Sequence, residues 1–516
     1  MSENIHGRGD RTLASVVPRA LGAVFVALAA PVLAWGPLSA STWWHPSSPW
    51  MEPWVCAWGL LAFVGPRLGL RAQPIVRAAW FGVITMACAG VLGVCRFAVD
   101  HMTTGDLFYG PWLGARRAAQ GLPVYDMAGL EEGVNASPFV IALLRPWART
   151  AVETFLPGWL SASALALVGF VVYAWLWLQL LWGKQEGRPG LAELALIMAA
   201  TFSFTSLQRS LRLGQLDSFV LCLLAAGTYH ATRGLCQPGC KERHGFAGAF
   251  LLVVATGVKV LPGVTLFGLA LAAWQLKRKR AIDNRALVRL LAGAALGTFV
   301  VAGVVVWGLG PGEIGRFFSS LPLMLRGSAA GANYAVVSRF AKYADPALRL
   351  SHAPLSSSTL FWLWPLRVAV ALGLIAAACR LKAERLQLLF ALTLAVLPLV
   401  SSLVWDIYFV WCAFFPWLLL LLSERRRADR RPVRALRAVL LAGSYFLLGV
   451  AGTGLVRNPV TNRVADTGLP MCFDEARLVG LFVVIGMLLW DLLRPEPASI
   501  AHPATVATSS VCVRDV

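Results

Sequence analysis

The sequence predicts an all-α polytopic membrane protein with about 12–14 transmembrane helices. Of its 516 residues, 58% are hydrophobic and only 14% are charged, and the mean hydropathy is +0.66. Soluble domains carry about 25% charged residues. Apolar runs of bilayer-spanning length also recur along the whole chain. A chain this long with so few charges lacks the polar surface that a water-soluble protein needs.

Apolar runs divide the chain into predicted spans and polar connections. They lie near 18–38, 53–66, 78–99, 159–182, 191–206, 216–232, 245–258, 260–276, 287–309, 359–379, 386–404, 407–423, 435–455 and 477–493. The shorter runs are expected to be tilted, re-entrant or broken helices. The predicted organisation is a cytoplasmic N-terminal tail (1–17), a multi-spanning domain (18–494) and a disordered cytoplasmic tail (495–516).

The positive charges predict the orientation. The formal net charge is +20, and Lys and Arg cluster in alternate connections, for example 67–77, 277–289, 380–385 and 425–437. The positive-inside rule places these connections and both termini in the cytoplasm. The long breaks 100–158 and 310–358 then face the outside of the plasma membrane. Because no basic face with interleaved aromatic residues emerges, nucleic-acid binding is not expected.

Two candidate site segments lie near predicted outer ends of spans. Asp106 opens the first long external loop, where a carboxylate could act as a general base toward a hydroxyl. The alternative is that Asp106 caps a helix. Arg209 and Arg212, three residues apart between two spans, could bind a phosphate. The alternative for these arginines is snorkelling to the membrane interface.

Two further segments carry charge in or beside apolar stretches. Lys259 lies at the tip of a predicted hairpin, deep in an apolar run, where an ammonium group needs a counter-anion or a wet cavity. Snorkelling is the alternative. Asp406 follows Trp405 at the outer end of another span. Arg339, in the segment 333–339, could be another phosphate ligand, although the sequence favours a solvated loop there.

Motifs of soluble enzymes are absent from the sequence. It holds no nucleotide-binding phosphate loop, no zinc-protease helix and no dinucleotide fingerprint, which disfavours an ATP-driven pump. Cys236 and Cys240 lack the second ligand pair of a zinc site. No cofactor or metal site is therefore predicted, and a requirement for a divalent cation is left open.

Taken in order, these segments resemble the polyprenyl-phosphate-dependent mannosyltransferases of glycosyltransferase family 87, which have the multi-spanning GT-C fold. The matching pieces are short and together cover about residues 100–425: Asp106, Tyr109, Gly121, Tyr125, Asp126, Pro138-Phe139, Arg145-Pro146, Leu213-Gly214-Gln215, Val258 to Pro262, Asn333 with Arg339, and Trp405-Asp406.

The resemblance implies an inverting transfer on the extracytoplasmic face. A sugar would leave a polyprenyl-phosphate donor and join a hydroxyl of a lipid or glycan acceptor. Asp106 would be the general base. The implied substrate-binding residues are Tyr109, Gln215, Lys259 and Asp406, with Arg209, Arg212 and Arg339 as additional cations for the phosphate.

The sequence departs from the family pattern at two places. Ala136-Ser137-Pro138 stands where members often carry Tyr-Pro-Pro, and Ile407-Tyr408 follows Trp405-Asp406 where a histidine is common. Two alternatives to the enzyme therefore stay open. One is a transporter or lipid flippase that uses the same charged residues along a pathway. The other is a non-catalytic scaffold.

Overall fold

The computed structural model describes nine stretches of the chain and a few single residues. The stretches are 107–125, 136–182, 204–212, 214–236, 241–324, 333–344, 355–424, 431–449 and 476–494; the single residues are Leu194, Ile197, Met198, Ala200 and Thr201. The predicted spans before residue 107 and both predicted tails lie outside these residues. Within the described part the secondary structure is helical, apart from one isolated β-bridge between Asn333 and Trp405.

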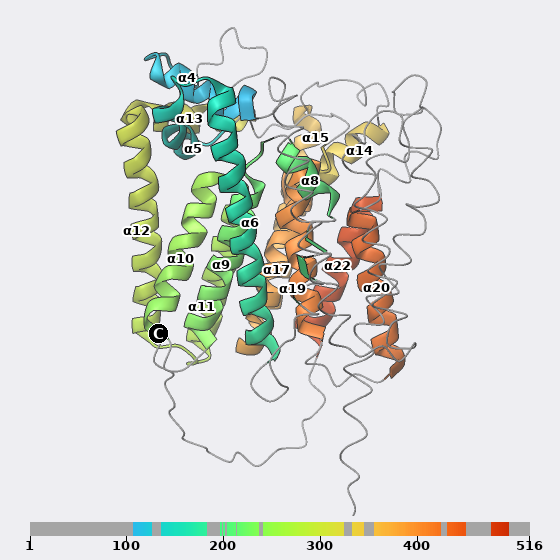
Figure 1. Cartoon of the computed structure of the whole chain (residues 1–516). Coiled ribbons are helices and arrows are strands. Elements are labelled where there is room, and N and C mark those ends of the chain that lie inside the picture. Colours follow the sequence, from blue (N-terminus) through green and yellow to red (C-terminus); the bar gives the residue numbers. More distant parts are fainter. Residues whose placement is uncertain are drawn as a thin grey trace, which may run out of the picture.

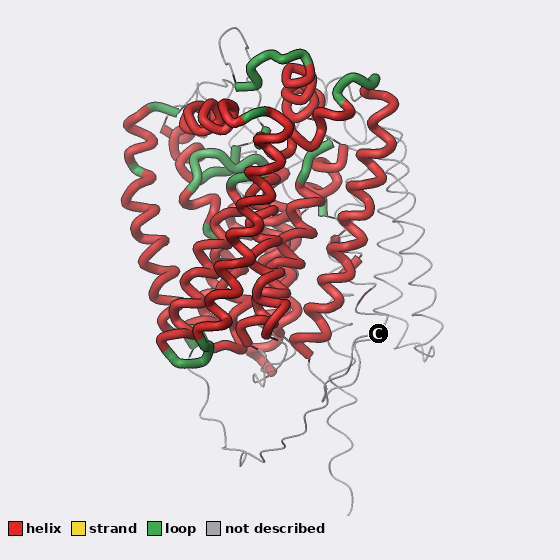
Figure 2. Tube along the Cα trace, turned by 90° about the vertical axis from the view of Figure 1, so that its left-hand side faces the viewer, coloured by secondary structure: helices red, strands yellow, loops and turns green. Residues whose placement is uncertain are grey.

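Roughly parallel helices, most of them long and a few broken into shorter pieces, form the body of the protein (Figures 1 and 2). They are α6 (Val152–Trp182), α9 (Asp217–Cys236), α10 (Lys241–Val258), α11 (Val264–Arg278), α12 (Asn284–Leu309), α16 (Leu363–Cys379), α17 (Leu386–Ala395), α18 (Leu397–Val400), α19 (Phe415–Ser423), α20 (Arg431–Gly449) and α22 (Ala476–Leu493). They follow the apolar runs that the sequence predicts as spans from 159–182 onward, apart from the run 191–206, of which only five single residues and the end, 204–206, are described.

Shorter helices gather at one end of the bundle, called here the upper end because it lies at the top of Figure 1. They are α4 (Leu113–Ala119), α5 (Pro138–Leu144), α8 (Thr205–Arg212), α13 (Pro311–Met324), α14 (Val336–Ala344) and α15 (Ser357–Phe361). Single turns complete the described part: η3 (Phe108–Trp112), η4 (Arg145–Trp147), η6 (Leu261–Gly263), η8 (Ala383–Arg385), η9 (Asp406–Tyr408) and η10 (Val410–Phe414). Most of these upper helices come from the two long breaks that the sequence predicts as external loops.

The composition of the long helices confirms an all-α, multi-pass membrane protein. Among the described residues, five helical segments are long and apolar enough to cross a bilayer: Thr154–Leu181, Asn284–Leu309, Ser357–Cys379, Ala383–Val400 and Ala476–Leu493. Shorter apolar helices lie over Arg243–Val258, Val410–Ser423 and Leu436–Tyr445. The total of about 12–14 spans stays a prediction, because the search covers only the described part of the chain.

Helix burial separates a central layer from a peripheral one. Every residue of α17 is buried, and the same holds for η10 directly before α19. In contrast, α12 exposes Leu291, Phe299 and Trp307, which are at least 61% accessible. A helix that exposes large apolar side chains along its length is suited to contact lipid, whereas a helix that is apolar and buried all round belongs to the core.

Small residues bring α9, α10 and α12 into close contact. A Cβ atom on Gly248 of α10 would lie 2.4 Å from the backbone nitrogen of Ala231 on α9. A Cβ atom on Gly293 of α12 would lie 2.1 Å from the carbonyl oxygen of Phe246 on α10. Close backbone approach at small residues is how apolar helices gain packing energy in a membrane, where burial of apolar surface from water supplies little.

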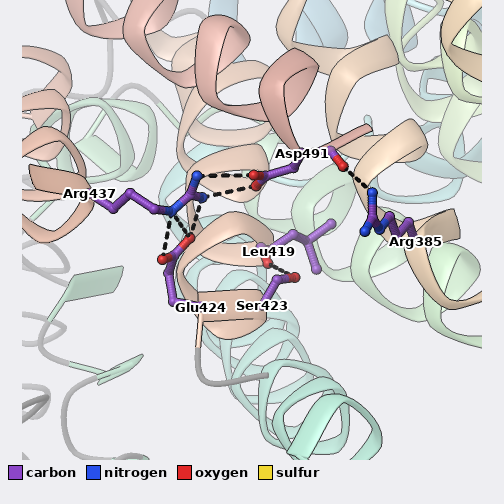
Figure 3. A network of polar contacts seen from close by, with 6 residues as sticks. All are labelled: Arg385, Leu419, Ser423, Glu424, Arg437 and Asp491. Carbon is purple, nitrogen blue, oxygen red and sulfur yellow. Dashed lines mark hydrogen bonds and ion pairs between the residues drawn. The ribbon is translucent and has the colours of Figure 1, made fainter. Parts of the chain in front are cut away.

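A buried ion cluster joins three helices at the lower end (Figure 3). The guanidinium of Arg437 on α20 donates to both carboxylate oxygens of Asp491 on α22 at 3.0 Å, and its Nε donates to Glu424 at 2.9 and 3.0 Å. Arg385 donates to the backbone carbonyl of Asp491 at 2.6 Å. The charges and hydrogen-bonding groups of Arg437 and of the two carboxylates are paired with one another. Without partners, burial of these groups would be strongly unfavourable.

Basic connections meet at the same lower end. Lys279, after α11, donates through Nζ to the carbonyl of Leu381 at 2.7 Å, and Gln275 donates to the carbonyl of Cys379 at 2.6 Å. The connections 277–289 and 380–385, which the sequence predicts to share one side of the membrane, therefore meet at Lys279 and Leu381. Their common location agrees with the alternation of basic and less basic connections from which the topology is predicted.

We expect Gly293→Ala to lower the free energy of unfolding by about 1–3 kcal/mol, because its methyl group overlaps the carbonyl of Phe246 and forces α10 and α12 apart. Thermal unfolding in detergent measures the change. Gly303→Ala on the same helix is the matched control, since its Cβ atom would meet nothing within 4 Å. A melting temperature as high for Gly293→Ala as for Gly303→Ala would contradict the close contact.

Candidate active site

Lys259 lies at the turn between α10 and η6, as the hairpin prediction requires. The last helical hydrogen bond of α10 runs from the Lys259 backbone nitrogen to the carbonyl of Ala255 at 3.0 Å. Pro262 in the second position of η6 lacks a backbone donor, and α11 begins at Val264. The side chain does not snorkel. Its Nζ atom donates to Asp217 at 2.6 Å and to Gln215 at 3.3 Å.

Asp217, the first residue of α9, is the counter-ion of Lys259. Its side chain has no exposed surface, and that of Lys259 is 13% exposed. Besides the lysine, Trp411 Nε1 donates to Oδ1 at 2.8 Å and Ser210 Oγ donates to Oδ2 at 2.9 Å. Both carboxylate oxygens therefore accept charge-assisted or polar hydrogen bonds, which offset the cost of removing the charge from water.

The turn between α8 and α9 brings Gln215 and Asp217 to the lysine. Gly214 has φ +66°, a conformation that costs most residues about 1–2 kcal/mol, and its missing side chain leaves room for Leu107. The backbone nitrogen of Gln215 donates to the carbonyl of Ser210 at 2.9 Å and ends α8. The Gly214 carbonyl accepts from Trp159 Nε1 at 3.0 Å, which fixes the turn against α6.

The segment after Trp405 covers the lysine from the other side. The Lys259 Nζ atom lies 4.4 Å from the centre of the Tyr408 ring, close enough for a cation–π interaction. Trp411 follows in η10, a π-helical turn within the run 407–423. Single π turns are rare and occur often at functional sites. This turn lies where Trp411 reaches across to Asp217 on α9.

The segment around Asn333 is buried, so the solvated loop that the sequence favours there is wrong. Asn333 has no exposed surface, and Arg339 is 6% exposed. The Asn333 amide donates to the carbonyl of Ser402 at 3.0 Å, and its oxygen accepts from the backbone of Ala335 and Val404 at 3.1 and 2.9 Å. One buried amide thus attaches this segment to the strand-like stretch that leads into Trp405.

Two arginines lie against Tyr334. The guanidinium carbon of Arg339 is 4.2 Å from the centre of the ring, and that of Arg477, on the first turn of α22, is 5.4 Å from it. The same ring packs against Phe409 at 5.4 Å between centroids. Phe409 directly follows Tyr408, so the Arg339 region and the Lys259 region are joined through 405–409. Arg477 was not predicted from the sequence, because a lone arginine at the start of an apolar run carries no motif.

The first and second long breaks contact each other at the upper end. The backbone nitrogen of Val124 donates to the buried Glu313 carboxylate on α13 at 3.3 Å. Tyr125 packs on Phe317 and donates to the carbonyl of Ala136 at 2.8 Å. Burial, and secondarily the Glu313 charge, raises the pKa of Tyr125 far above its ordinary value. The Tyr125 hydroxyl therefore remains a proton-bearing donor and is unsuited to act as a base.

The structure describes some of the predicted site residues and leaves out others. Gln215, Lys259 and the Arg339 segment are brought into one connected region. Asp106 lies outside the described residues. The backbones of Tyr109, Arg209, Arg212 and Asp406 fall in η3, α8 and η9, but their side chains lie outside the description. Within the described part, no three His, Cys, Asp or Glu side chains are grouped to hold a metal ion.

Asp217, Ser210 and Trp411 are the residues of this region that sequence reasoning did not assign. Asp217 and Ser210 belong to a segment that was examined for its arginines, and Trp411 resembles an ordinary membrane-interface tryptophan. An acidic residue at the start of an apolar helix was the available signal for Asp217, but helix capping explains such a residue equally well.

The comparison with known families matches the same part of the chain. The model described as Glycosyltransferase family 87 matches residues 137–404, which is more than half of the sequence. This range contains Gln215, Lys259, Asn333 and Arg339. It ends just before Trp405. No curated protein matches the sequence.

Asn333→Asp tests the buried amide. The carboxylate can still accept hydrogen bonds from the backbone of Ala335 and Val404. It cannot donate to the carbonyl of Ser402, and it adds a buried negative charge. We expect a loss of about 1–3 kcal/mol in the free energy of unfolding. Detergent-solubilised protein unfolded by heat gives the measurement, with Ser319→Ala on the exposed side of α13 as the control. Equal melting temperatures for the two variants would argue against the amide connection.

Proposed function

The chain belongs to glycosyltransferase family 87 and is a membrane glycosyltransferase, and from this premise we propose that it transfers a sugar, expected to be mannose, from a polyprenyl-phosphate donor. The acceptor is a lipid or a glycan. The reaction takes place on the extracytoplasmic face of the plasma membrane and inverts the anomeric configuration.

The observation that carries the proposal is the convergence of sequence segments that lie far apart. Gln215 and Lys259 are hydrogen-bonded at 3.3 Å although they belong to two different turns, 44 residues apart in the chain. Asn333 forms a β-bridge with Trp405, and Tyr408 stacks on Lys259. These contacts join the same segments that carry the family resemblance. Ionisable side chains that meet inside an apolar bundle often mark a functional site.

In the proposed reaction the acceptor hydroxyl oxygen attacks the anomeric carbon of the donor sugar. Asp106 takes the hydroxyl proton as the general base, which contributes about 10²–10⁴-fold. The bond between the anomeric carbon and the phosphate oxygen breaks, and the electron pair leaves with the phosphate. Lys259 and Arg339, with Arg209 and Arg212, stabilise the negative charge on the leaving group. Tyr109, Gln215 and Asp406 bind the substrates.

The donor chemistry agrees with the absence of nucleotide-binding motifs. A polyprenyl-phosphate sugar is already activated, so the enzyme needs cations for a lipid phosphate and no phosphate-binding glycine loop. Tyr408 lies at one of the two places where the sequence departs from the family pattern. Near the position where relatives commonly carry histidine, this chain has an aromatic ring on the ammonium group of Lys259.

The distribution of charge supports the proposed orientation. Basic connections around Lys279 and Arg385 lie at the lower end of the bundle, together with the C-terminal end of α22. The positive-inside rule assigns such connections to the cytoplasm. The Lys259 region lies at the turn between α10 and α11, away from the lower ends of those helices. A donor phosphate at the outer leaflet would therefore approach from the side of the upper helices.

Membranes that contain the protein should transfer label from radiolabelled polyprenyl-phospho-mannose to a new lipid product. Asp106→Asn should reduce this rate by about 10²–10⁴-fold, since the amide cannot accept the acceptor proton. Lys259→Met should also reduce it, because the methionine cannot balance the phosphate charge. The measurement is label in extracted lipid per amount of correctly inserted protein.

Ser319→Ala is the control for this assay, because Ser319 is exposed on α13 and lies outside the proposed site. Normal transfer by Asp106→Asn would remove the assigned base. Movement of labelled lipid across vesicles without any covalent product would favour a transporter or flippase. No transfer and no movement with any polyprenyl-phosphate sugar would favour a scaffold.

A further inference from the structure

Asp217 is a buried carboxylate with three hydrogen-bond donors. It has no exposed surface, and it accepts hydrogen bonds from Lys259, Trp411 and Ser210 at 2.6, 2.8 and 2.9 Å. A carboxylate removed from water is stable only when it is paired and hydrogen-bonded. The three donors meet that need in full, so the carboxylate is held at a fixed position in the bundle.

The donors come from separate parts of the chain. Ser210 belongs to α8, Asp217 begins α9, Lys259 follows α10, and Trp411 lies in η10. Trp411 is fully buried between ring contacts and core side chains, so its indole N–H cannot follow a moving partner. Asp217 is therefore held in place by the buried Trp411 indole, with Ser210 of α8 on its other carboxylate oxygen. The third donor, Lys259, has the flexible stem, and its position is the one that the carboxylate determines.

We propose that Asp217 is a positioning residue that orients the Lys259 ammonium group for the phosphate of the lipid donor. This inference rests on the proposed function. The ammonium has three N–H donors, of which one goes to Asp217 and a weaker one to Gln215. The Tyr408 ring limits its movement on another side. The direction that remains defines where a phosphate oxygen binds. A cation held in advance loses less freedom when the substrate arrives.

Asp217 acts through the lysine and does not contact the substrate. Both of its oxygens accept from protein donors, and its side chain is inaccessible. Its negative charge would repel a phosphate at short range. The same features make it unsuitable as the base of the reaction, because a general base must reach the proton that it removes. The role of Asp217 is thus distinct from that proposed for Asp106.

The test compares substitutions of Asp217 with substitutions of its other two hydrogen-bond donors, Trp411 and Ser210. Asp217→Asn keeps the shape and removes the charge, so the KM for polyprenyl-phospho-mannose should rise about 10–100-fold. Trp411→Phe and Ser210→Ala, which loosen the carboxylate, should raise it about 3–10-fold. The KM for the acceptor should stay within about twofold in all three variants. Asp217→Glu, which keeps the charge, should recover part of the donor affinity.

Inhibition by polyprenyl phosphate and by polyprenol separates recognition of the phosphate group from recognition of the isoprenoid tail. The inhibition constant of polyprenyl phosphate should be higher for Asp217→Asn than for the unaltered protein. The factor should equal the rise in the KM for the donor. Polyprenol, which lacks the phosphate, should act equally on both. A purely structural role would lower the amount of folded protein and leave these ratios unchanged.

Asp491→Asn is the matched control. Asp491 is also a buried carboxylate in a hydrogen-bonded ion pair, with Arg437 at 3.0 Å, but it lies at the lower end of the bundle. Its substitution should lower the melting temperature and leave the donor KM unchanged. An unchanged donor KM in Trp411→Phe and in whichever Asp217 variant folds would overturn the inference, provided that the unaltered protein transfers sugar. If the unaltered protein transfers none, the proposed function itself fails.

Discussion

The buried negative charge of Asp217 organises the part of the protein around Lys259. The carboxylate of Asp217 has no contact with solvent, and a charge in that position is tolerated only when a cation and further donors surround it. This requirement determines where four segments of the chain can lie. α8 ends so that Ser210 reaches the carboxylate, the helix of α10 stops so that Lys259 can pair with it, and η10 widens into a π turn where Trp411 donates to it. The packing of the apolar helices has to accommodate this arrangement.

Two buried ion clusters lie at different levels of the bundle. The pair of Asp217 and Lys259 lies toward the upper helices, and Arg437, whose contacts with Glu424 and Asp491 are drawn in Figure 3, lies at the lower end. The largely apolar helix α17 is buried on every side. An ion pair specifies its partners more strictly than an apolar contact does, because an unpaired buried charge is very costly. The two levels therefore fix the register of helices that could otherwise slide along one another.

Much of the architecture could be predicted from the sequence, because the membrane imposes a simple rule on composition. Long apolar runs must become helices, and α12 and α22 begin three residues and one residue before their predicted runs and end where those runs end. The hairpin tip at Lys259 was predictable for the same reason, since a charge between two apolar runs marks a break. The segment around Asn333 was not. Its burial depends on hydrogen bonds to Ser402 and Val404, about 70 residues away in the chain, and no local pattern encodes such a contact.

The partners of Lys259 were predictable only in part. Its need for a counter-anion follows from the cost of a charge near hydrocarbon, and Gln215 was suggested by the family resemblance. Asp217 was not singled out, because helix capping explains an aspartate at that position equally well. Trp411 was hidden by the ordinary preference of tryptophan for the membrane interface. The comparison with the family defines the range 137–404 but names no individual side chain.

The contacts of Gly248 with Ala231 and of Gly293 with Phe246 leave the backbones of α9, α10 and α12 too close for any lipid chain to pass between them. These three helices form a sealed wall on one flank of Lys259. A long isoprenoid tail whose phosphate binds at the lysine cannot enter through this wall. It must extend into the bilayer past another boundary of the bundle, so the wall restricts the side from which such a donor is loaded.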